Sequence, residues 1–278
     1  MKKTLNDIKN LINKADCILI GAGSGLSSSA GLEYSGKNFE NNYKDFIDKY
    51  NFEDLYSASF YPFNTQEEKW AFWARLIKLN RFNKEPLKLY CYIYNLVKDK
   101  EYFVITTNVD GQFEKAGFDK ENIFATQGDY AYLQCEKACH NKLYYNEELV
   151  EKWLINTNDC KIPSNLIMKC PICKGNMDMN LRKDAYFVQD ENWYKQDKRY
   201  SEFLDRNKNK SVLLLEFGVG FNTPGIIRFP FEQMTLENRN WTLVRFNKDT
   251  RSFYNLEDRF IEIQEDIKNF LEEKENKK

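Results

Sequence analysis

The sequence predicts an α/β protein in which a parallel β-sheet is covered by helices on both faces. Short apolar runs alternate with amphipathic segments, and several of the runs end in glycine or asparagine. This alternation favours a parallel sheet, because the return to a parallel strand needs a crossover connection that is usually helical. The expected strands are residues 17–20, 102–106, 122–126, 211–217 and 241–246.

Apolar residues at helical spacing predict the helices between these strands. Residues 5–12 form a short amphipathic helix, and Pro86 opens another before the second strand. Residues 39–82 are aromatic-rich and helical; we expect these rings to pack a helical subdomain, although some could line a pocket. A closing helix is expected to carry Leu256, Phe260, Ile263, Ile267 and Leu271, followed by a solvated Lys/Glu-rich tail.

Composition bounds the class of protein. The chain has 278 residues, of which 42% are hydrophobic, enough to bury a core in one large domain or in a main domain with an insertion. The formal net charge of −1 gives no reason to expect a nucleic-acid partner. The N-terminus lacks the apolar core of a signal peptide, and no apolar run is long enough to span a bilayer. We expect a cytoplasmic protein with no membrane partner.

The stretch from residue 17 to residue 31 contains the first candidate binding element. An apolar run enters a turn rich in glycine, at Gly21, Gly23 and Gly25, and leaves through small residues that can begin a helix. Bare amides at a helix N-terminus favour a phosphate group. Glycines at such a turn let the backbone approach a pyrophosphate, as in dinucleotide-binding proteins. The alternative is an ordinary strand-to-helix turn.

Polar residues follow the later strands. Asn108 and Asp110 come just after the strand at residues 102–106, and Gln127 follows the strand at residues 122–126. Parallel strands bind ligands at their carboxyl ends, so these side chains are candidates for one site. The alternative for Asn108 and Asp110 is a turn or a helix cap.

Four cysteines have metal-ligand spacing. Cys135 and Cys139 are separated by three residues, and Cys170 and Cys173 by two. Two close pairs joined by a longer connection match a structural zinc site with four thiolates. His140, the one histidine in the chain, could compete as a ligand, and the alternative is a set of unrelated free thiols. We expect zinc to staple an insertion at residues 130–185 and to take no part in the chemistry.

Taken in order, these motifs resemble those of the sirtuins. Residues 21–32 are similar to the family's opening NAD-binding motif, and residues 106–110 to its Thr-Gln-Asn-Ile-Asp motif. The cysteine pairs follow, and then residues 218–224 and Asn247, which resemble the segments that hold ribose and adenine. The resemblance implies the sirtuin fold, with a Rossmann-type NAD-binding domain and a small helical and zinc-ribbon domain. The first would comprise residues 1–38, 84–130 and 186–278, and the second a helical module at 39–83 and a zinc module at 131–185.

The resemblance also implies roles for individual residues. Asn108 would organise the reacting face, and Asp110 would hold the nicotinamide carboxamide. The remaining residues that would bind NAD are Gly21, Ala22, Gly23, Gly25, Leu26, Gln127, Gly218, Gly220, Asn222 and Asn247.

Three departures from the family pattern affect the expected activity. Gln127 stands where the family has a catalytic histidine, and glutamine can orient a hydroxyl but cannot act as its base. Loss of a positioned base costs about 10²- to 10⁴-fold in rate. Residues 33–36 replace the family's Pro-Asp-Phe-Arg, and no Phe-Gly-Glu segment follows Cys173. These changes put an acyl-lysine groove in doubt.

The pattern with Gln127 looks most like the microbial class M sirtuins, which are associated with protein mono-ADP-ribosylation. The resemblance implies a protein substrate, with a lipoylated carrier protein of the glycine-cleavage H type as a target and a macrodomain protein as a partner. Arg182 becomes a candidate for a charge contact with substrate or cofactor; the alternative is a solvated surface arginine. The rival functions are an NAD-dependent lysine deacylase, a non-catalytic NAD or ADP-ribose sensor, and an NAD glycohydrolase.

Overall fold

A computed structural model of the chain describes residues 3–32, 35–82, 85–248, 251–252 and 254–272. The sequence departures at Glu33 and Tyr34, and the charged tail from residue 273, lie outside these residues. The chain divides into two compact units. The first comprises Met1–Gly31, Pro86–Gln127 and Glu191–Lys278, and the second Leu32–Glu85 and Gly128–Asp190. The NAD-binding role predicted for a domain of similar extent to the first unit stays a prediction at this stage.

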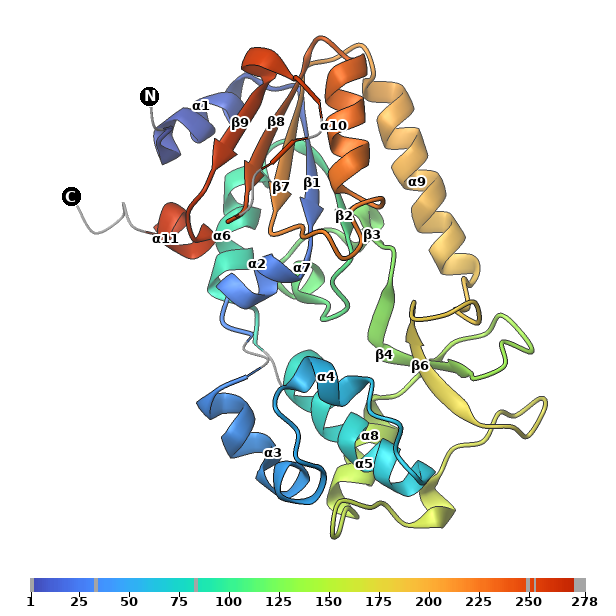
Figure 1. Ribbon diagram of the computed structural model, residues 1–278. Helices are drawn as coiled ribbons and strands as arrows, with labels where there is room; N and C mark the ends of the chain where they lie inside the picture. Colours follow the sequence, from blue (N-terminus) through green and yellow to red (C-terminus); the bar gives the residue numbers. More distant parts are fainter. Residues whose placement is uncertain (1–2, 33–34, 83–84, 249–250, 253, 273–278) are drawn as a thin grey trace. The chain divides into compact units, whose positions relative to one another are not determined.

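The first unit is built on a 6-stranded sheet in the order β3-β2-β1-β7-β8-β9 (Figure 1). Every neighbouring pair is parallel, and β1 lies between β2 and β7, so the strand order reverses there. Reversal points of parallel sheets are where their ligands bind, at the carboxyl ends of the strands. The strands are β1 (Cys17–Ala22), β2 (Glu101–Thr106), β3 (Ile123–Ala125), β7 (Val212–Phe217), β8 (Trp241–Phe246) and β9 (Phe260–Ile263).

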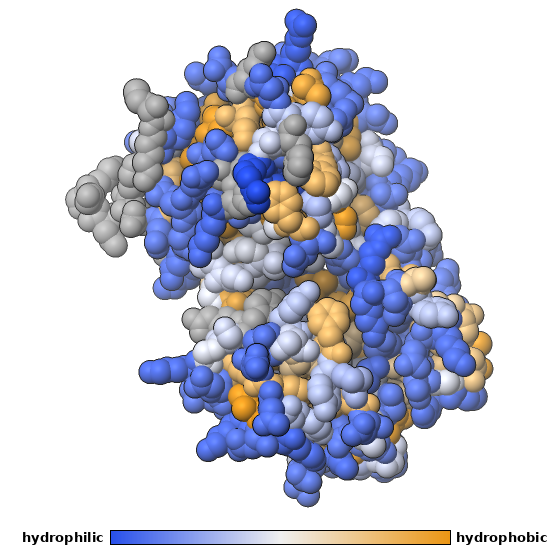
Figure 2. Space-filling model, in the orientation of Figure 1, coloured by the Kyte–Doolittle hydropathy of each residue, from blue (hydrophilic) through white to orange (hydrophobic). Residues whose placement is uncertain are grey.

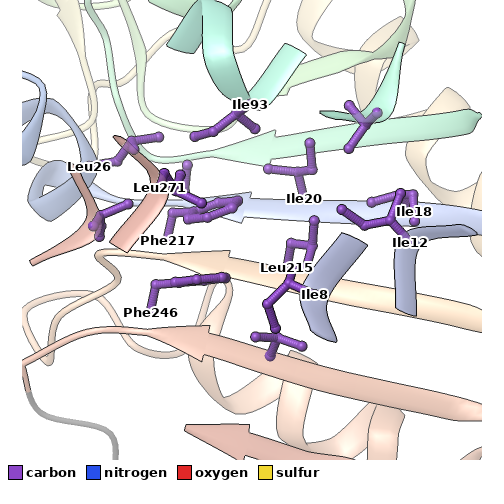
Figure 3. Close-up of a cluster of buried hydrophobic side chains, with 14 of the residues drawn as sticks. Ile8, Ile12, Ile18, Ile20, Leu26, Ile93, Leu215, Phe217, Phe246 and Leu271 are labelled. Carbon is purple, nitrogen blue, oxygen red and sulfur yellow. The ribbon is translucent and has the colours of Figure 1, made fainter. Parts of the chain in front are cut away.

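Helices cover both faces of this sheet, as the alternating pattern predicts. Ile18 and Ile20 of β1 enter one buried cluster (Figure 3), whereas Cys17 and Leu19 enter the other. Because both faces are covered, the central strands are mostly apolar, with Glu216 of β7 and Arg245 of β8 as buried charged exceptions. The first cluster is closed by α1 (Leu5–Lys14), α2 (Ser24–Ser29), α6 (Lys88–Val97), α7 (Gln112–Lys115) and α11 (Ile267–Glu272), and the second by α9 (Glu191–Asn207) and α10 (Arg228–Glu237).

The prediction of a closing helix from Leu256 to Leu271 is wrong for more than half of these residues. A short 3₁₀ turn, η4 (Glu257–Arg259), leads into strand β9, which pairs with β8, and helix begins only at Ile267. In β9, Ile261 and Ile263 are buried and Glu262 between them is exposed. This is the alternation of a strand at a sheet edge. The same apolar residues also fit a helical spacing, and pairing with β8 decides between the two.

A buried charge network joins β7, β8 and α10. Arg245 donates from Nε to Oε1 of Glu216 at 2.8 Å and from Nη2 to Oε2 of the same carboxylate at 2.9 Å. Its Nη1 donates to Glu232 Oε1 at 2.7 Å, and all three side chains are 0% exposed. Burial raises the pKa of Glu216 even though the Arg245 guanidinium opposes the shift. The network is therefore satisfied, but each member depends on its partners.

Arg245→Met is expected to destabilise the protein by about 3–5 kcal/mol, because it removes the cation that hydrogen-bonds to both buried carboxylates and leaves Glu216 only the more distant Arg228, whose Nη1 lies 4.0 Å from Glu216 Oε1. The matched control is Arg206→Met, which removes an ion pair to Glu101 whose side chains are 50% and 35% exposed. That control should cost about 1 kcal/mol or less. Urea unfolding followed by circular dichroism measures both, and equal losses would contradict the importance assigned to the network.

The second unit combines a helical core with a small sheet. Its helices are α3 (Lys37–Tyr50), α4 (Leu55–Ser59), α5 (Gln66–Ile77), the π-helix η1 (Lys78–Phe82), α8 (Glu147–Ile155) and the 3₁₀ turn η3 (Ser164–Leu166). The sheet has the order β5-β4-β6, with β4 (Gly128–Cys135), β5 (Tyr144–Tyr145) and β6 (Met177–Leu181) paired antiparallel. Aromatic rings of residues 39–82 fill the core as expected; Trp70, for example, stacks on Trp153 with centroids 4.8 Å apart.

Figure 2 shows hydrophilic side chains over most of the face it presents, with apolar ones in small groups. Scattered exposed apolar residues are ordinary in globular proteins. Within the described residues, every helix is too short or too polar to cross a lipid bilayer.

Candidate functional site

The glycine turn after β1 packs against the loop that follows β7. Gly23 N donates to Phe217 O, and Gly25 N donates to Gly218 O, each at 3.0 Å. A Cβ on Gly23 or Gly25 would lie 2.9 or 2.8 Å from Gly218, and one on Gly218 would lie 2.3 Å from the Leu26 amide nitrogen. Gly218 also has a positive φ of 60°. These glycines are required for the two loops to approach each other, a reason that the sequence pattern alone does not reveal.

The helix after this turn is short. α2 has six residues, so its dipole is small and does not by itself make a phosphate site. Gly220 and Gly225 are open positions of the loop after β7, since a Cβ at either one would meet nothing within 4 Å.

Asn108 and Asp110 are brought to the β1 turn by the end of β2. Asn108 Nδ2 donates to Gly23 O at 3.0 Å, and its backbone nitrogen donates to Thr106 Oγ1 at 3.0 Å. Asp110 accepts from Ser27 Oγ at 2.7 Å and from Gln112 N at 3.0 Å. The second bond is a local turn that satisfies the first amide of the short helix α7, whose N-cap is Gly111. Both side chains are almost fully buried, at 9% and 6% exposed.

Gln127 follows β3 and has an unsatisfied oxygen. β3 is tied to β2 where Thr126 N donates to Thr106 O at 3.0 Å. The Gln127 side chain is half-buried, and its carbonyl oxygen Oε1 is shielded from water without a hydrogen-bond partner among the described residues. A buried acceptor without a hydrogen-bond donor lowers the stability of the folded protein. A ligand hydroxyl would supply that donor.

The ends of β7 and β8 complete this edge of the first unit. Asn247 Nδ2 donates to Val219 O at 2.7 Å, and Arg228 Nη1 donates to the same oxygen at 3.1 Å. Asn222, predicted for the same site, is exposed. Sequence reasoning missed Arg228, which lies within the apolar-rich helix α10, and the Phe221 ring lies 4.1 Å from its guanidinium carbon.

Arg182 belongs to the second unit, just after β6. It is exposed, and its guanidinium carbon lies 5.7 Å from the centre of the Phe187 ring. It is therefore not brought together with Asn108 and Gln127 within one unit, and its predicted role stays a proposal.

The four predicted zinc ligands converge in the second unit. The sulfurs of Cys135 and Cys173 lie 3.6 Å apart, as do those of Cys139 and Cys170. A tetrahedral zinc with bonds of about 2.3 Å sets its sulfurs about 3.8 Å apart, so the cluster fits zinc. His140 Nδ1 lies 3.1 Å from Cys139 Sγ, so the histidine stays a possible competitor.

The backbone around Cys170 favours the ligand form of its thiol. Desolvation raises the pKa of Cys170, but backbone amides of Cys173 and Ile172 donate to the sulfur and lower it to about 6. A thiolate is the form that binds metal.

The sequence matches the Sir2 family over residues 23–209, which is more than half of the chain. This chain belongs to the Sir2 family. A protein ADP-ribosyltransferase of Staphylococcus aureus (strain Mu50 / ATCC 700699) is 37% identical over 266 residues, covering 95% of this chain and 84% of that relative. A probable bifunctional ADP-ribose hydrolase/ADP-ribosyltransferase of Fusarium oxysporum f. sp. cubense is 30% identical over 247 residues. The match covers 84% of this chain but 40% of the fungal protein.

Solved structures of Sir2 proteins share the fold. A structure of Sir2Tm bound to a propionylated peptide has a TM-score of 0.58 and 16% identity, covering 97% of this chain and 96% of that one. A Sir2 complex with a p53 peptide and NAD⁺ gives the same score, identity and coverage. The predicted resemblance to sirtuins, and within them to the ADP-ribosylating class, is confirmed.

Proposed function

We propose that this chain is an NAD-dependent protein mono-ADP-ribosyltransferase that attaches ADP-ribose to a protein acceptor and releases nicotinamide. Family membership and the two relatives support NAD-dependent ADP-ribosyl transfer. The observation that carries the proposal is Gln127, whose unsatisfied Oε1 can accept a ribose hydroxyl hydrogen bond but cannot take its proton.

The residues of the sheet edge fit NAD. Gly220 leaves space beside the loop after β7, and Gln127 offers a buried acceptor to a hydroxyl. Bound NAD would supply a ribose carbon whose bond to nicotinamide is broken, with the electron pair leaving on nicotinamide. A lone pair of the acceptor would form the new bond to that carbon, and the acceptor's proton would pass to solvent.

Within this proposal the protein mainly positions the reacting groups and stabilises the charge that develops between them. The Nδ2 of Asn108 is engaged by Gly23 O, so its carbonyl oxygen is the group offered to the reacting ribose. Asp110, whose carboxylate accepts from Ser27 Oγ and Gln112 N, is the residue that we propose to receive the nicotinamide amide. Fixed dipoles aimed at developing charge are usually the largest contribution to such catalysis. Arg182 would contribute charge toward the acceptor.

The acceptor and partner are finer proposals. We propose a lipoylated carrier protein of the glycine-cleavage H type as the acceptor, on the resemblance to class M sirtuins. A macrodomain protein that removes the modification is proposed as a partner. The name of the fungal relative, which joins an ADP-ribose hydrolase with a transferase in one chain, supports that pairing.

The test uses NAD labelled on its adenylate phosphate, with three acceptors in parallel: a lipoylated carrier protein, the same carrier without lipoate, and an acetyl-lysine peptide. The expected result is label on the lipoylated carrier and an unchanged peptide. Deacetylation without protein labelling would favour the deacylase instead. Nicotinamide release with unlabelled proteins would indicate a glycohydrolase, and equal labelling of both carriers would remove lipoate from the proposal while leaving transfer intact.

A further inference from the structure

Four buried polar side chains form a continuous hydrogen-bonded chain beside the turn that follows β1. Asn108 Nδ2 lies 3.1 Å from Tyr90 Oη, which lies 2.8 Å from Ser27 Oγ, which lies 2.7 Å from Asp110 Oδ2. Tyr90 is 0% exposed and Ser27 is 1% exposed. The chain joins three segments of the first unit: helix α6, helix α2 and the loop after β2. Two residues without an assigned role therefore connect the two predicted catalytic and binding residues.

With Asp110 ionised, its carboxylate sets the direction of each hydrogen bond among these four side chains. An ionised carboxylate only accepts, so the single hydroxyl hydrogen of Ser27 goes to Asp110. The hydrogen shared between Tyr90 and Ser27 must then come from Tyr90. The tyrosine oxygen is left as an acceptor, which is what the Asn108 amide hydrogen needs.

This order determines which way the Asn108 amide faces. Nδ2 donates to two acceptors, Gly23 O at 3.0 Å and Tyr90 Oη at 3.1 Å. Turning the amide over would set Oδ1 against the Gly23 carbonyl oxygen, an arrangement in which neither atom can donate. The tyrosine hydroxyl thus supplies half of the hold on the amide nitrogen.

Tyr90 and its helix are themselves held by side chains of helix α7. Its ring meets Phe113 edge-on, with centroids 4.9 Å apart. The first turn of its helix is anchored where Leu87 N donates to Gln112 Oε1 at 2.8 Å. Gln112 N in turn donates to Asp110. The hydroxyl is therefore set in place by the folded unit before any ligand binds.

We propose that Tyr90 is a positioning residue, whose hydroxyl fixes the amide of Asn108 with its carbonyl oxygen toward the reacting ribose. The positioning of Asn108 by Tyr90 is a property of the ligand-free protein, whereas its effect on nicotinamide release rests on the function proposed above. These are the structural part and the kinetic part of the proposal. Loss of the hydroxyl should release one side of the amide, slow nicotinamide release and leave NAD affinity nearly unchanged.

The structural part is tested by NMR of the Asn108 side-chain amide in the ligand-free protein, with that signal identified by its loss in Asn108→Asp. Tyr90→Phe keeps the ring and removes the hydroxyl. One of the two amide hydrogens should exchange with solvent about five- to tenfold faster, the value of one buried hydrogen bond, while the other is unchanged. Tyr94→Phe, one turn further along α6, is the control and should alter neither. An unaltered amide in Tyr90→Phe would overturn the proposal.

The kinetic part uses nicotinamide release by the full chain. Tyr90→Phe is expected to lower kcat about tenfold with less than a twofold change in the KM for NAD, while Tyr94→Phe changes neither. Ser27→Ala interrupts the same series of hydrogen bonds. The double variant of Ser27→Ala and Tyr90→Phe should therefore be no slower than the slower of the two single variants. A raised KM at unchanged kcat, or losses that multiply, would overturn the proposal. If the unaltered protein releases no nicotinamide, the proposed function fails while the NMR result still decides the role of Tyr90.

Discussion

Asn108→Ala is expected to reduce nicotinamide release by about 10²- to 10³-fold, the usual cost of removing one fixed dipole aimed at developing charge. The side chain is nearly buried, and its nitrogen is engaged by Gly23 O and Tyr90 Oη, so its carbonyl oxygen is rigidly presented. Nicotinamide release is measured by chromatography at saturating NAD, and the choice of acceptor protein does not matter for this measurement.

The control is Asn13→Ala, an exposed asparagine of α1, which should leave the rate unchanged. Because Asn108→Ala deprives two buried groups of a partner, it should also lose about 1–3 kcal/mol of stability and still fold. A rate within a factor of three of the unaltered protein would remove Asn108 from the site.

Loss of zinc is expected to unfold the cysteine-bearing part of the second unit. Structural zinc contributes apparent binding free energies of about 10–16 kcal/mol, all of which is folding free energy where the site does not exist in the unfolded chain. Three core positions depend on this folding directly, because Cys135, Cys170 and Met177 belong to one buried cluster. The purified protein should contain one zinc ion per chain, and a chelator should remove it together with near-ultraviolet circular dichroism of the packed aromatic rings.

Single substitutions identify the ligand set. Cys170→Ser and Cys173→Ser should each lose zinc, whereas Cys91→Ser, outside the cluster, should keep it. His140→Ala should also keep zinc, since four thiolates complete a tetrahedral shell. Zinc retained by Cys173→Ser and lost by His140→Ala would instead establish three cysteines and the histidine as ligands.

The sheet of the first unit could be predicted because its strands carry strong local signals. Val212 to Leu215 form an unbroken apolar run, and such a run in a parallel sheet is buried on both faces. The cysteine cluster was predictable for a similar reason, since the spacing within each pair already sets two sulfurs close together. β9 was not predictable, because its apolar residues fit both a helical and a strand period and only pairing with β8 separates them.

The site was predictable only where residues directly follow strands. Asn108, Asp110 and Gln127 are located by the strand ends that precede them. Tyr90 lacks such a signal, because in the sequence it is one more large residue on the buried stripe of α6. Its hydrogen bonds cross 63 residues to Ser27 and 18 to Asn108, and contacts at such separations come from tertiary structure alone.

The measurement that tests the central claim most directly is the ratio of ADP-ribose attached to protein to nicotinamide released in one reaction. Intact-protein mass spectrometry gives the first quantity and chromatography the second, with an acetyl-lysine peptide present as a competing acceptor. The account predicts one ADP-ribose on the acceptor protein for each nicotinamide released, and a peptide that keeps its acetyl group. Nicotinamide release matched by peptide deacetylation, with no ADP-ribose on protein, would contradict it.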